Sequence, residues 1–161
     1  KHAARFDVGH EANSGIAGRH VPQCCGGAGR AQAEIQPQMA QKILLVDDSS
    51  IIRTQYRLVL QKAGYEVVEA WDAAQAASAL KTLDIAFMLC DYNIPGVNGL
   101  DLIEAMRQQP RLAALPTAIL SADVNPTLVA RAKRAEVAGW LVKPCSADKL
   151  LELIAQCAGP A

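Results

Sequence analysis

Short apolar runs alternate with stretches of helical character five times between Met39 and the end of the chain. Each run is mostly apolar and contains no internal proline, which is typical of strands that are buried on both faces. Strands that alternate with helices pair in parallel, because each helix returns the chain to the start of the sheet. The alternation therefore predicts an α/β domain whose parallel sheet carries helices on both faces.

Composition and flanking residues indicate where these elements begin and end. The predicted strands cover residues 43–46, 67–70, 85–90, 117–120 and 140–142. Residues that cap free backbone N–H groups precede four of the predicted helices; they are Asp72, Asn98, Asn125 and Ser146. Pro126 suits the first turn of the fourth helix, and Gly64 is placed to end the first. In that first helix an apolar stripe recurs at three- and four-residue steps, formed by Ile52, Tyr56, Val59, Leu60 and Ala63.

The composition excludes several classes of protein. The 161 residues, 51% of them hydrophobic, suffice for one domain, and sixteen basic residues balance sixteen acidic ones. Five cysteines without CxxC spacing argue against a disulfide framework and a zinc site. No apolar run approaches the roughly 18 to 20 residues that span a bilayer, and no signal-peptide pattern is present. We therefore expect a cytoplasmic protein that does not bind membranes or nucleic acid directly.

Residues 1–38 differ from the rest of the chain. They hold all three histidines and many Gly, Ala and Gln residues, with almost no apolar periodicity. This composition predicts a disordered extension, a tag or a mis-assigned start, so we place the domain at residues 39–161. His20, Cys24 and Cys25 lie close together here, but without four-ligand spacing they do not indicate a metal site.

Polar side chains stand where four of the predicted strands end. Asp47 and Asp48 follow the first strand, and Asp91, Ser121 and Lys143 follow the third, fourth and fifth. Parallel strands end at one edge of a sheet, where ligands bind in open α/β folds. Carboxylates gathered there repel one another unless a cation lies among them, and Mg2+ prefers oxygen ligands. Each residue alone also suits a cap, a turn or the surface, but their joint placement favours a magnesium site.

Four segments then match the signature segments of a known family. They are VDDSS at 46–50, CDYNIPGVNGLDL at 90–102, ILSAD at 119–123 and GWLVKP at 139–144. Their order and spacing over residues 42–157 resemble the CheY-like receiver domain of two-component response regulators. The resemblance implies a flavodoxin-like, doubly wound (βα)5 fold with a five-stranded parallel sheet in the order 2-1-3-4-5.

The resemblance also implies a role for each polar residue at this edge. Asp91 is the phosphoacceptor, whose carboxylate attacks phosphorus and forms an acyl phosphate. Asp48, Asp91 and the backbone carbonyl of Asn93 bind Mg2+ directly, while Asp47 acts mainly through water. Lys143 pairs with the transferring phosphoryl group as a point charge.

Ser121 and Trp140 form the expected switch. The Ser121 hydroxyl donates a hydrogen bond to a phosphoryl oxygen. Trp140 occupies the position of the family's usual Tyr or Phe, which packs inward in the active state. Because indole is larger and its N–H needs a partner when buried, a movement of Trp140 is left open. Cys145 replaces a commoner Phe, and we interpret Cys90 and Cys145 as small apolar fillers rather than reactive thiols.

These implications predict a phosphorylation-dependent switch that catalyses only its own phosphorylation and dephosphorylation. The resemblance implies a sensor histidine kinase as the phosphoryl donor, and a phosphohistidine must come from outside the domain because residues 39–161 contain no histidine. The expected recipient of the signal is a downstream protein partner. The alternative is a phosphorelay carrier, which passes the group to a histidine phosphotransfer protein. A homodimer formed on phosphorylation is also left open.

Other functional classes fit the sequence less well. An aspartyl-phosphate-forming phosphatase of the haloacid dehalogenase type requires DxDx[TV] after the first strand, where this chain has VDDSS. The phosphate-binding motifs GxGxxG after the first strand and GxxxxGK[ST] are absent. A purely structural pseudo-receiver typically lacks an acidic residue or the lysine, and none is missing here. Arg131, Lys133 and Arg134 form a basic stretch without a nucleic-acid recognition motif.

Overall fold

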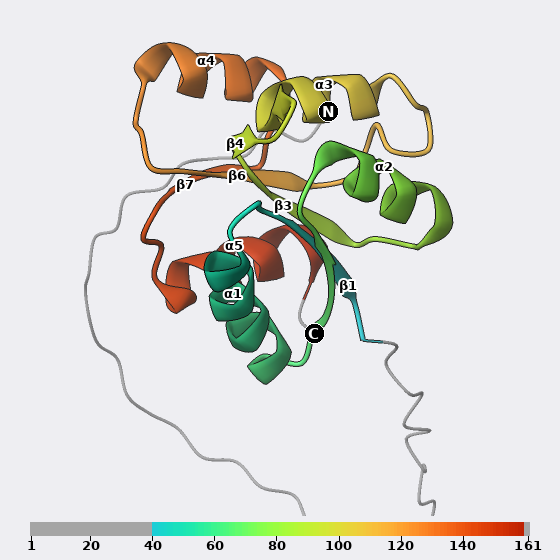
Figure 1. Ribbon diagram of the computed structural model, residues 1–161, viewed down its shortest axis with the longest axis vertical. Coiled ribbons are helices and arrows are strands. Elements are labelled where there is room, and N and C mark those ends of the chain that lie inside the picture. Colours follow the sequence, from blue (N-terminus) through green and yellow to red (C-terminus); the bar gives the residue numbers. More distant parts are fainter. Residues whose placement is uncertain (1–39, 160–161) are drawn as a thin grey trace, which may run out of the picture. The chain divides into compact units, whose positions relative to one another are not determined.

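The structure is a computed structural model that describes residues 40–159 (Figure 1). Within this range a parallel sheet of five strands has the order β2-β1-β3-β6-β7. The strands are β1 (Lys42–Val46), β2 (Glu66–Ala70), β3 (Phe87–Asp91), β6 (Thr117–Ser121) and β7 (Gly139–Val142). The helices are α1 (Ser50–Lys62), α2 (Ala73–Thr82), α3 (Gly99–Arg107), α4 (Pro126–Arg134) and α5 (Ala147–Ala158). The predicted fold class and strand order are confirmed, since β4 (Asn93–Ile94) and β5 (Val97–Asn98) form a separate hairpin.

Helices cover both faces of the sheet. Figure 1 shows α1 and α5 on one side and α2, α3 and α4 on the other. Successive residues of β1 point to opposite faces: Leu44 and Val46 pack in the cluster that includes α2, α3 and α4. Ile43 and Leu45 pack in the cluster that includes α1 and α5. All four side chains are fully buried, which is why this strand is a continuous apolar run in the sequence.

Four of the helices begin at the predicted caps, with one difference in mechanism, while α1 has Ser49 as its N-cap, for which no cap was predicted. Asp72, Asn98 and Asn125 each accept a hydrogen bond from a backbone N–H in the first turn of α2, α3 or α4. Ser146 is the N-cap residue of α5, but its side chain accepts no such bond. The prediction for Ser146 is therefore right in position and wrong in mechanism. Asp148 in the first turn of α5 places a negative charge near the helix N-terminus, which stabilises it instead.

The third strand and the segment after it differ most from the prediction, since each of the other four strands is only one residue longer than predicted. The strand covers Phe87–Asp91 rather than residues 85–90, because the ladder to β1 begins at Phe87 and the ladder to β6 extends to Asp91. The following segment, in which no strand was predicted, forms the antiparallel β4–β5 hairpin. Gly96 has a positive φ at its tip, a conformation that glycine adopts without strain.

No helix within residues 40–159 is long and apolar enough to cross a membrane. The cysteines in this range are free thiols, and Cys90 is fully buried. Burial raises the pKa of the Cys90 thiol well above its ordinary value, which agrees with an inert apolar filler. The predictions for residues 1–38, including those for His20, Cys24 and Cys25, lie outside the described residues.

Candidate functional site

The predicted polar residues meet at the carboxyl edge of the sheet. Asp47 and Lys143 directly follow β1 and β7, while Asp91 and Ser121 are the last residues of β3 and β6. Backbone hydrogen bonds continue past the strand ends, since the N–H of Lys143 donates to the carbonyl of Ser121 over 2.8 Å. Asp47, Asp91 and Ser121 are buried, whereas Asp48 is exposed. The sheet thus fixes the backbone of every residue that carries a buried polar group here.

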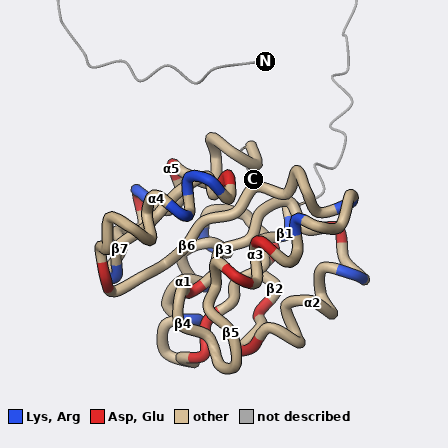
Figure 2. Tube along the Cα trace, turned by 90° about the horizontal axis from the view of Figure 1, so that it is seen from above, with Lys and Arg blue, Asp and Glu red and all other residues tan. Residues whose placement is uncertain are grey.

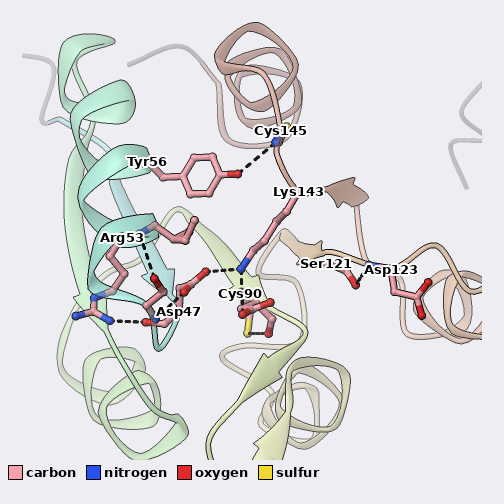
Figure 3. Close-up of polar contacts among 11 residues, drawn as sticks. Asp47, Arg53, Tyr56, Cys90, Ser121, Asp123, Lys143 and Cys145 are labelled. Carbon is pink, nitrogen blue, oxygen red and sulfur yellow. Dashed lines mark hydrogen bonds and ion pairs between the residues drawn. The ribbon is translucent and has the colours of Figure 1, made fainter.

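Lys143 connects two of the carboxylates (Figure 3). Its Nζ lies 2.6 Å from Asp47 Oδ2 and 3.0 Å from Asp91 Oδ2. The side chains of Lys143, Asp47 and Asp91 are 17%, 0% and 9% exposed. Because water reaches these groups so little, the ammonium and the two carboxylates stabilise each other in place of solvent. Loss of one charge therefore leaves a buried charge uncompensated.

The protonation of this cluster follows from burial and from the lysine. Burial raises the pKa of the Asp91 carboxyl above its ordinary value, although the hydrogen bond and charge of Lys143 oppose this. Burial acts to lower the pKa of Lys143, but hydrogen bonds to Asp47 and Asp91 outweigh it and the pKa is raised. The lysine is therefore an ammonium ion at neutral pH. A fixed positive charge beside a desolvated carboxylate suits an incoming anionic group.

Two further contacts hold Asp47 in place. The backbone N–H of Ser49 donates to Asp47 Oδ1 over 2.9 Å, and Arg53 Nη1 donates to the backbone carbonyl of Asp47 over 2.6 Å. Arg53 also pairs with Glu69 of β2 over 3.6 Å. Arg53 was not predicted from the sequence, because a side chain that binds a main-chain carbonyl leaves no pattern of residue types.

The acidic residues have the chemistry of a cation site. Within the described part of the chain, carboxylate oxygens of Asp47, Asp48 and Asp91 all lie within 4.8 Å of one another. A cavity of about 480 Å³ is lined by Asp48, Asn93 and other residues of the β4–β5 hairpin. Hard oxygen donors beside a cavity with room for water suit Mg2+, which keeps several of its waters when bound. The residues present fit this ion.

The two predicted switch residues contact a common neighbour in the loop between β6 and α4. Ser121 Oγ accepts a hydrogen bond from the backbone N–H of Asp123 over 3.1 Å. Trp140 Nε1 donates to the backbone carbonyl of Asp123 over 3.3 Å, so the indole has the partner that it needs. The Trp140 ring also packs on Tyr92, with ring centroids 5.7 Å apart. Asp123 therefore joins Ser121 to Trp140.

Gly99 is a second residue whose role was not predicted from the sequence. A Cβ atom at this position would overlap the backbone carbonyl oxygen of Asp91. The N–H of Gly99 also donates to the Tyr92 carbonyl over 2.7 Å. Glycine is required here because the first turn of α3 touches the main chain of the residue that bears the candidate acceptor.

The basic stretch of α4 is partly neutralised by α3. Arg131 Nη2 lies 2.6 Å from Glu104 Oε2, and the guanidinium also pairs with Asp101. Figure 2 shows the Lys and Arg positions along α4. Since Arg131 is paired within the domain, the stretch offers less positive charge to a nucleic acid than its sequence suggests.

Known proteins with similar sequences carry the same type of domain as the one that the geometry indicates. The model of the response regulator receiver domain family matches residues 43–155. The chain is 36% identical over 114 residues to the chemotaxis protein CheY of Pseudomonas aeruginosa, a match that covers 70% of this chain and 92% of that protein. It is 32% identical over 121 residues to the sensory/regulatory protein RpfC of Xanthomonas campestris pv. campestris, covering 74% of this chain and 17% of RpfC.

Solved structures of response regulators are similar to this one. The structure of the chemotaxis response regulator CheY4 of Vibrio cholerae superposes with a TM-score of 0.68 at 31% identity, covering 73% of this chain and 98% of that one. A response regulator receiver protein from Pseudomonas putida gives a TM-score of 0.69 at 31% identity, covering 73% of this chain and 97% of that one. The family match includes every residue from Asp47 to Lys143 that meets at the carboxyl edge. The chain belongs to the response regulator receiver domain family, the CheY-like domains of two-component signalling.

Proposed function

We propose that Asp91 is the phosphoacceptor of this receiver domain. A carboxylate oxygen of Asp91 attacks the phosphorus of a phosphorylated donor and forms an O–P bond. The bond between phosphorus and the donor breaks, and the donor leaves with that electron pair. The observation that carries the proposal is the 3.0 Å contact between Asp91 Oδ2 and Lys143 Nζ at the carboxyl edge of the sheet.

Asp91 suits this role better than the neighbouring carboxylates. Asp47 is fully buried, and its two oxygens already accept hydrogen bonds from the Ser49 N–H and from Lys143. Asp48 is exposed, and the Lys143 ammonium contacts the other two carboxylates rather than this one. Asp91 combines a contact with the ammonium group and a small remaining exposure, which a nucleophile needs to reach its donor.

The remaining residues would hold and neutralise the transferring group. Asp48, Asp91 and the backbone carbonyl of Asn93 would bind Mg2+, with Asp47 acting mainly through water. The bound ion would supply positive charge against the phosphoryl oxygens. Lys143 pairs with one of these oxygens, and buried Asp47 keeps the ammonium in position before the group arrives. Charges that are fixed in advance cost no reorganisation at the moment of transfer.

Phosphorylation is transmitted from the site by a conformational change. The Ser121 hydroxyl donates to a phosphoryl oxygen, a contact that exists only in the phosphorylated state. Such differential contacts are what shift an equilibrium between two conformations. Because Asp123 is bonded to both Ser121 and Trp140, movement of Ser121 alters the packing of the indole. The surface formed by α4 and β7 then changes.

A sensor histidine kinase is the proposed donor and a protein partner the proposed recipient. Residues 39–161 contain no histidine, so a phosphohistidine donor lies outside the domain. Transfer from Asp91 to a histidine phosphotransfer protein is the alternative within the same class. Profiling of phosphotransfer against a panel of histidine kinases identifies the donor, and mixing the phosphorylated domain with phosphotransfer proteins separates the two outputs.

Phosphorylation by a small donor tests the acceptor. The protein is incubated with acetyl phosphate and Mg2+, and its intact mass is measured. We expect wild type to gain one phosphoryl group and Asp91→Asn to gain none. Asp84→Asn, which changes an exposed carboxylate on the amino side of β3, should behave like wild type. If Asp91→Asn were labelled as fully as wild type, the assignment of Asp91 would be wrong.

A further inference from the structure

Tyr56 of α1 contacts the loop that follows β7. Its hydroxyl oxygen accepts a hydrogen bond from the backbone N–H of Cys145 over 3.4 Å (Figure 3). The two residues are 89 positions apart in the sequence, so the bond joins separate elements of the fold. Cys145 stands two positions after Lys143, and Tyr56 therefore touches the segment that carries the ammonium group of the site.

The tyrosine is held firmly at its other end. Tyr56 is 4% exposed and packs in the buried cluster that α1 and α5 form against the sheet. Cys145 packs against the same cluster. Burial raises the pKa of the Tyr56 phenol, so the hydroxyl stays protonated at physiological pH, and a lone pair of its oxygen accepts the N–H of Cys145. A buried tyrosine hydroxyl usually finds such a partner.

The loop is thereby held on both sides of Lys143. On the strand side, the N–H of Lys143 donates to the Ser121 carbonyl over 2.8 Å. Pro144 has no N–H, so the next backbone donor along the loop is that of Cys145. Tyr56 binds this donor. Between the two anchors, Lys143 Nζ contacts the two buried carboxylates.

We propose that Tyr56 is a positioning residue for Lys143. Its hydroxyl restrains the Lys143–Cys145 loop so that the ammonium lies against Asp47 and Asp91 before a phosphoryl group arrives. Phenylalanine would fill the same volume without accepting the bond, so its effect isolates the hydroxyl. The rate test of this inference rests on the proposed function, because it is read from phosphoryl transfer to Asp91.

The rate of phosphorylation by acetyl phosphate at saturating Mg2+ provides the first test. We expect Tyr56→Phe to be phosphorylated about threefold more slowly, because a hydrogen bond of 3.4 Å lies at the weak end of the usual range. Tyr65→Phe is the matched control: Tyr65 is 5% exposed, and its hydroxyl donates to the Gly159 carbonyl over 3.1 Å. Its rate should stay within about twofold of wild type, because the same group is removed at a contact that does not involve Lys143.

A double-mutant cycle shows whether Tyr56 acts through the lysine. In a Lys143→Met background, Tyr56→Phe should cause no further loss of rate, because there is no ammonium left to position. An equal slowing in the presence and absence of Lys143 would overturn the proposal. So would a wild-type rate for Tyr56→Phe, or a loss for Tyr65→Phe as large as that for Tyr56→Phe.

Nuclear magnetic resonance gives a readout that does not depend on phosphorylation. Tyr56→Phe should speed the hydrogen exchange of the Cys145 amide several-fold and shift the Lys143 ¹³Cε resonance, whereas Tyr65→Phe should change neither. Unchanged exchange and an unchanged resonance in Tyr56→Phe would refute the positioning role. If wild type accepted no phosphoryl group, the proposed function would fail, and these two signals would still decide the role of Tyr56.

Discussion

At the scale of single residues, Lys143 compensates the negative charge of the buried carboxylates at the carboxyl edge of the sheet. Asp47 is fully buried, and a buried carboxylate is very costly unless it is paired and hydrogen-bonded. Lys143 supplies the pair, and it also lies 3.0 Å from Asp91. Asp48 is exposed, so it is free to bind a cation without losing a protein partner. The three aspartates therefore differ: Asp47 and Asp91 are paired with the lysine, whereas Asp48 is exposed to solvent.

The exposed carboxylate gives the clearest test of the cation site. We expect Asp48→Ala to weaken Mg2+ binding by more than about tenfold, because even outer groups of metal sites cost that much when removed. Isothermal titration calorimetry with Mg2+ measures the affinity. The matched variant Asp84→Ala removes an exposed carboxylate on the amino side of β3 and should bind Mg2+ like wild type. Equal affinities for wild type and Asp48→Ala would exclude Asp48 as a ligand.

At the scale of elements, the approach of α3 to β3 constrains the acceptor strand. Gly99 allows the first turn of the helix to touch the Asp91 carbonyl, and its N–H donates to Tyr92. Any side chain at this position must displace the helix or the strand end. The α3–β3 contact therefore fixes the position of the Asp91 backbone, from which the carboxylate side chain extends.

Substitution of this glycine separates helix propensity from packing. Propensity alone predicts that Gly99→Ala stabilises α3 by about 1 kcal/mol. The overlap with the Asp91 carbonyl predicts the opposite, a loss of about 2 kcal/mol or more, because overpacked backbone must shift. Urea unfolding measures the difference. Gly139→Ala, whose Cβ would meet the side chain of Leu153 rather than a backbone atom, should lose less, and a stabilised Gly99→Ala would contradict the contact.

The loop between β6 and α4 is the second element with a direct test. Trp71 is the other tryptophan of the chain, so its replacement in Trp71→Phe leaves Trp140 as the source of tryptophan fluorescence. In this background, phosphorylation by acetyl phosphate should change the fluorescence of Trp140, because Asp123 joins the indole to Ser121. Ser121→Ala should still gain the phosphoryl mass but show a smaller change in fluorescence, and Ser121→Thr, which keeps a hydroxyl, should restore part of it. A full fluorescence response from Ser121→Ala would remove Ser121 from the switch.

At the scale of the whole molecule, the described residues account for the whole family match. The match covers residues 43–155, and the two buried clusters draw on the sheet and all five of the helices described between residues 40 and 159. We place the domain at residues 39–161, as the composition suggests. Residues 1–38 carry little apolar content that could offset the roughly 1 to 2 kcal/mol per residue that backbone ordering costs.

Deletion of residues 1–38 tests this boundary. We expect the protein that starts at Met39 to unfold within a few degrees of the full chain in a thermal melt, and to accept a phosphoryl group at the same rate. A loss of several kcal/mol, seen as a drop of about 10 °C or more for a domain of this size, would mean that the deleted residues pack against the domain.

The fold class followed from the amino-acid sequence alone, because the alternation of apolar runs and helical stretches is a local property that reports burial on both faces of a sheet. It also indicated which residues gather at one edge, since parallel strands all end there and Asp47, Asp91 and Lys143 stand at those ends. Signature segments supplied the strand order, which no local pattern encodes. The roles of the site residues and of Mg2+ remain predictions.

The contacts that hold the site together became visible only in the folded structure. Arg53 binds a main-chain carbonyl, Tyr56 reaches an amide 89 positions away, and Gly99 is defined by what a side chain would strike. The spacing of apolar residues places Tyr56 in the apolar stripe of its helix, which describes its ring correctly but says nothing about its hydroxyl. Periodicity reports whether a residue is buried, whereas hydrogen bonds between distant elements depend on distances and angles that arise when the layers pack.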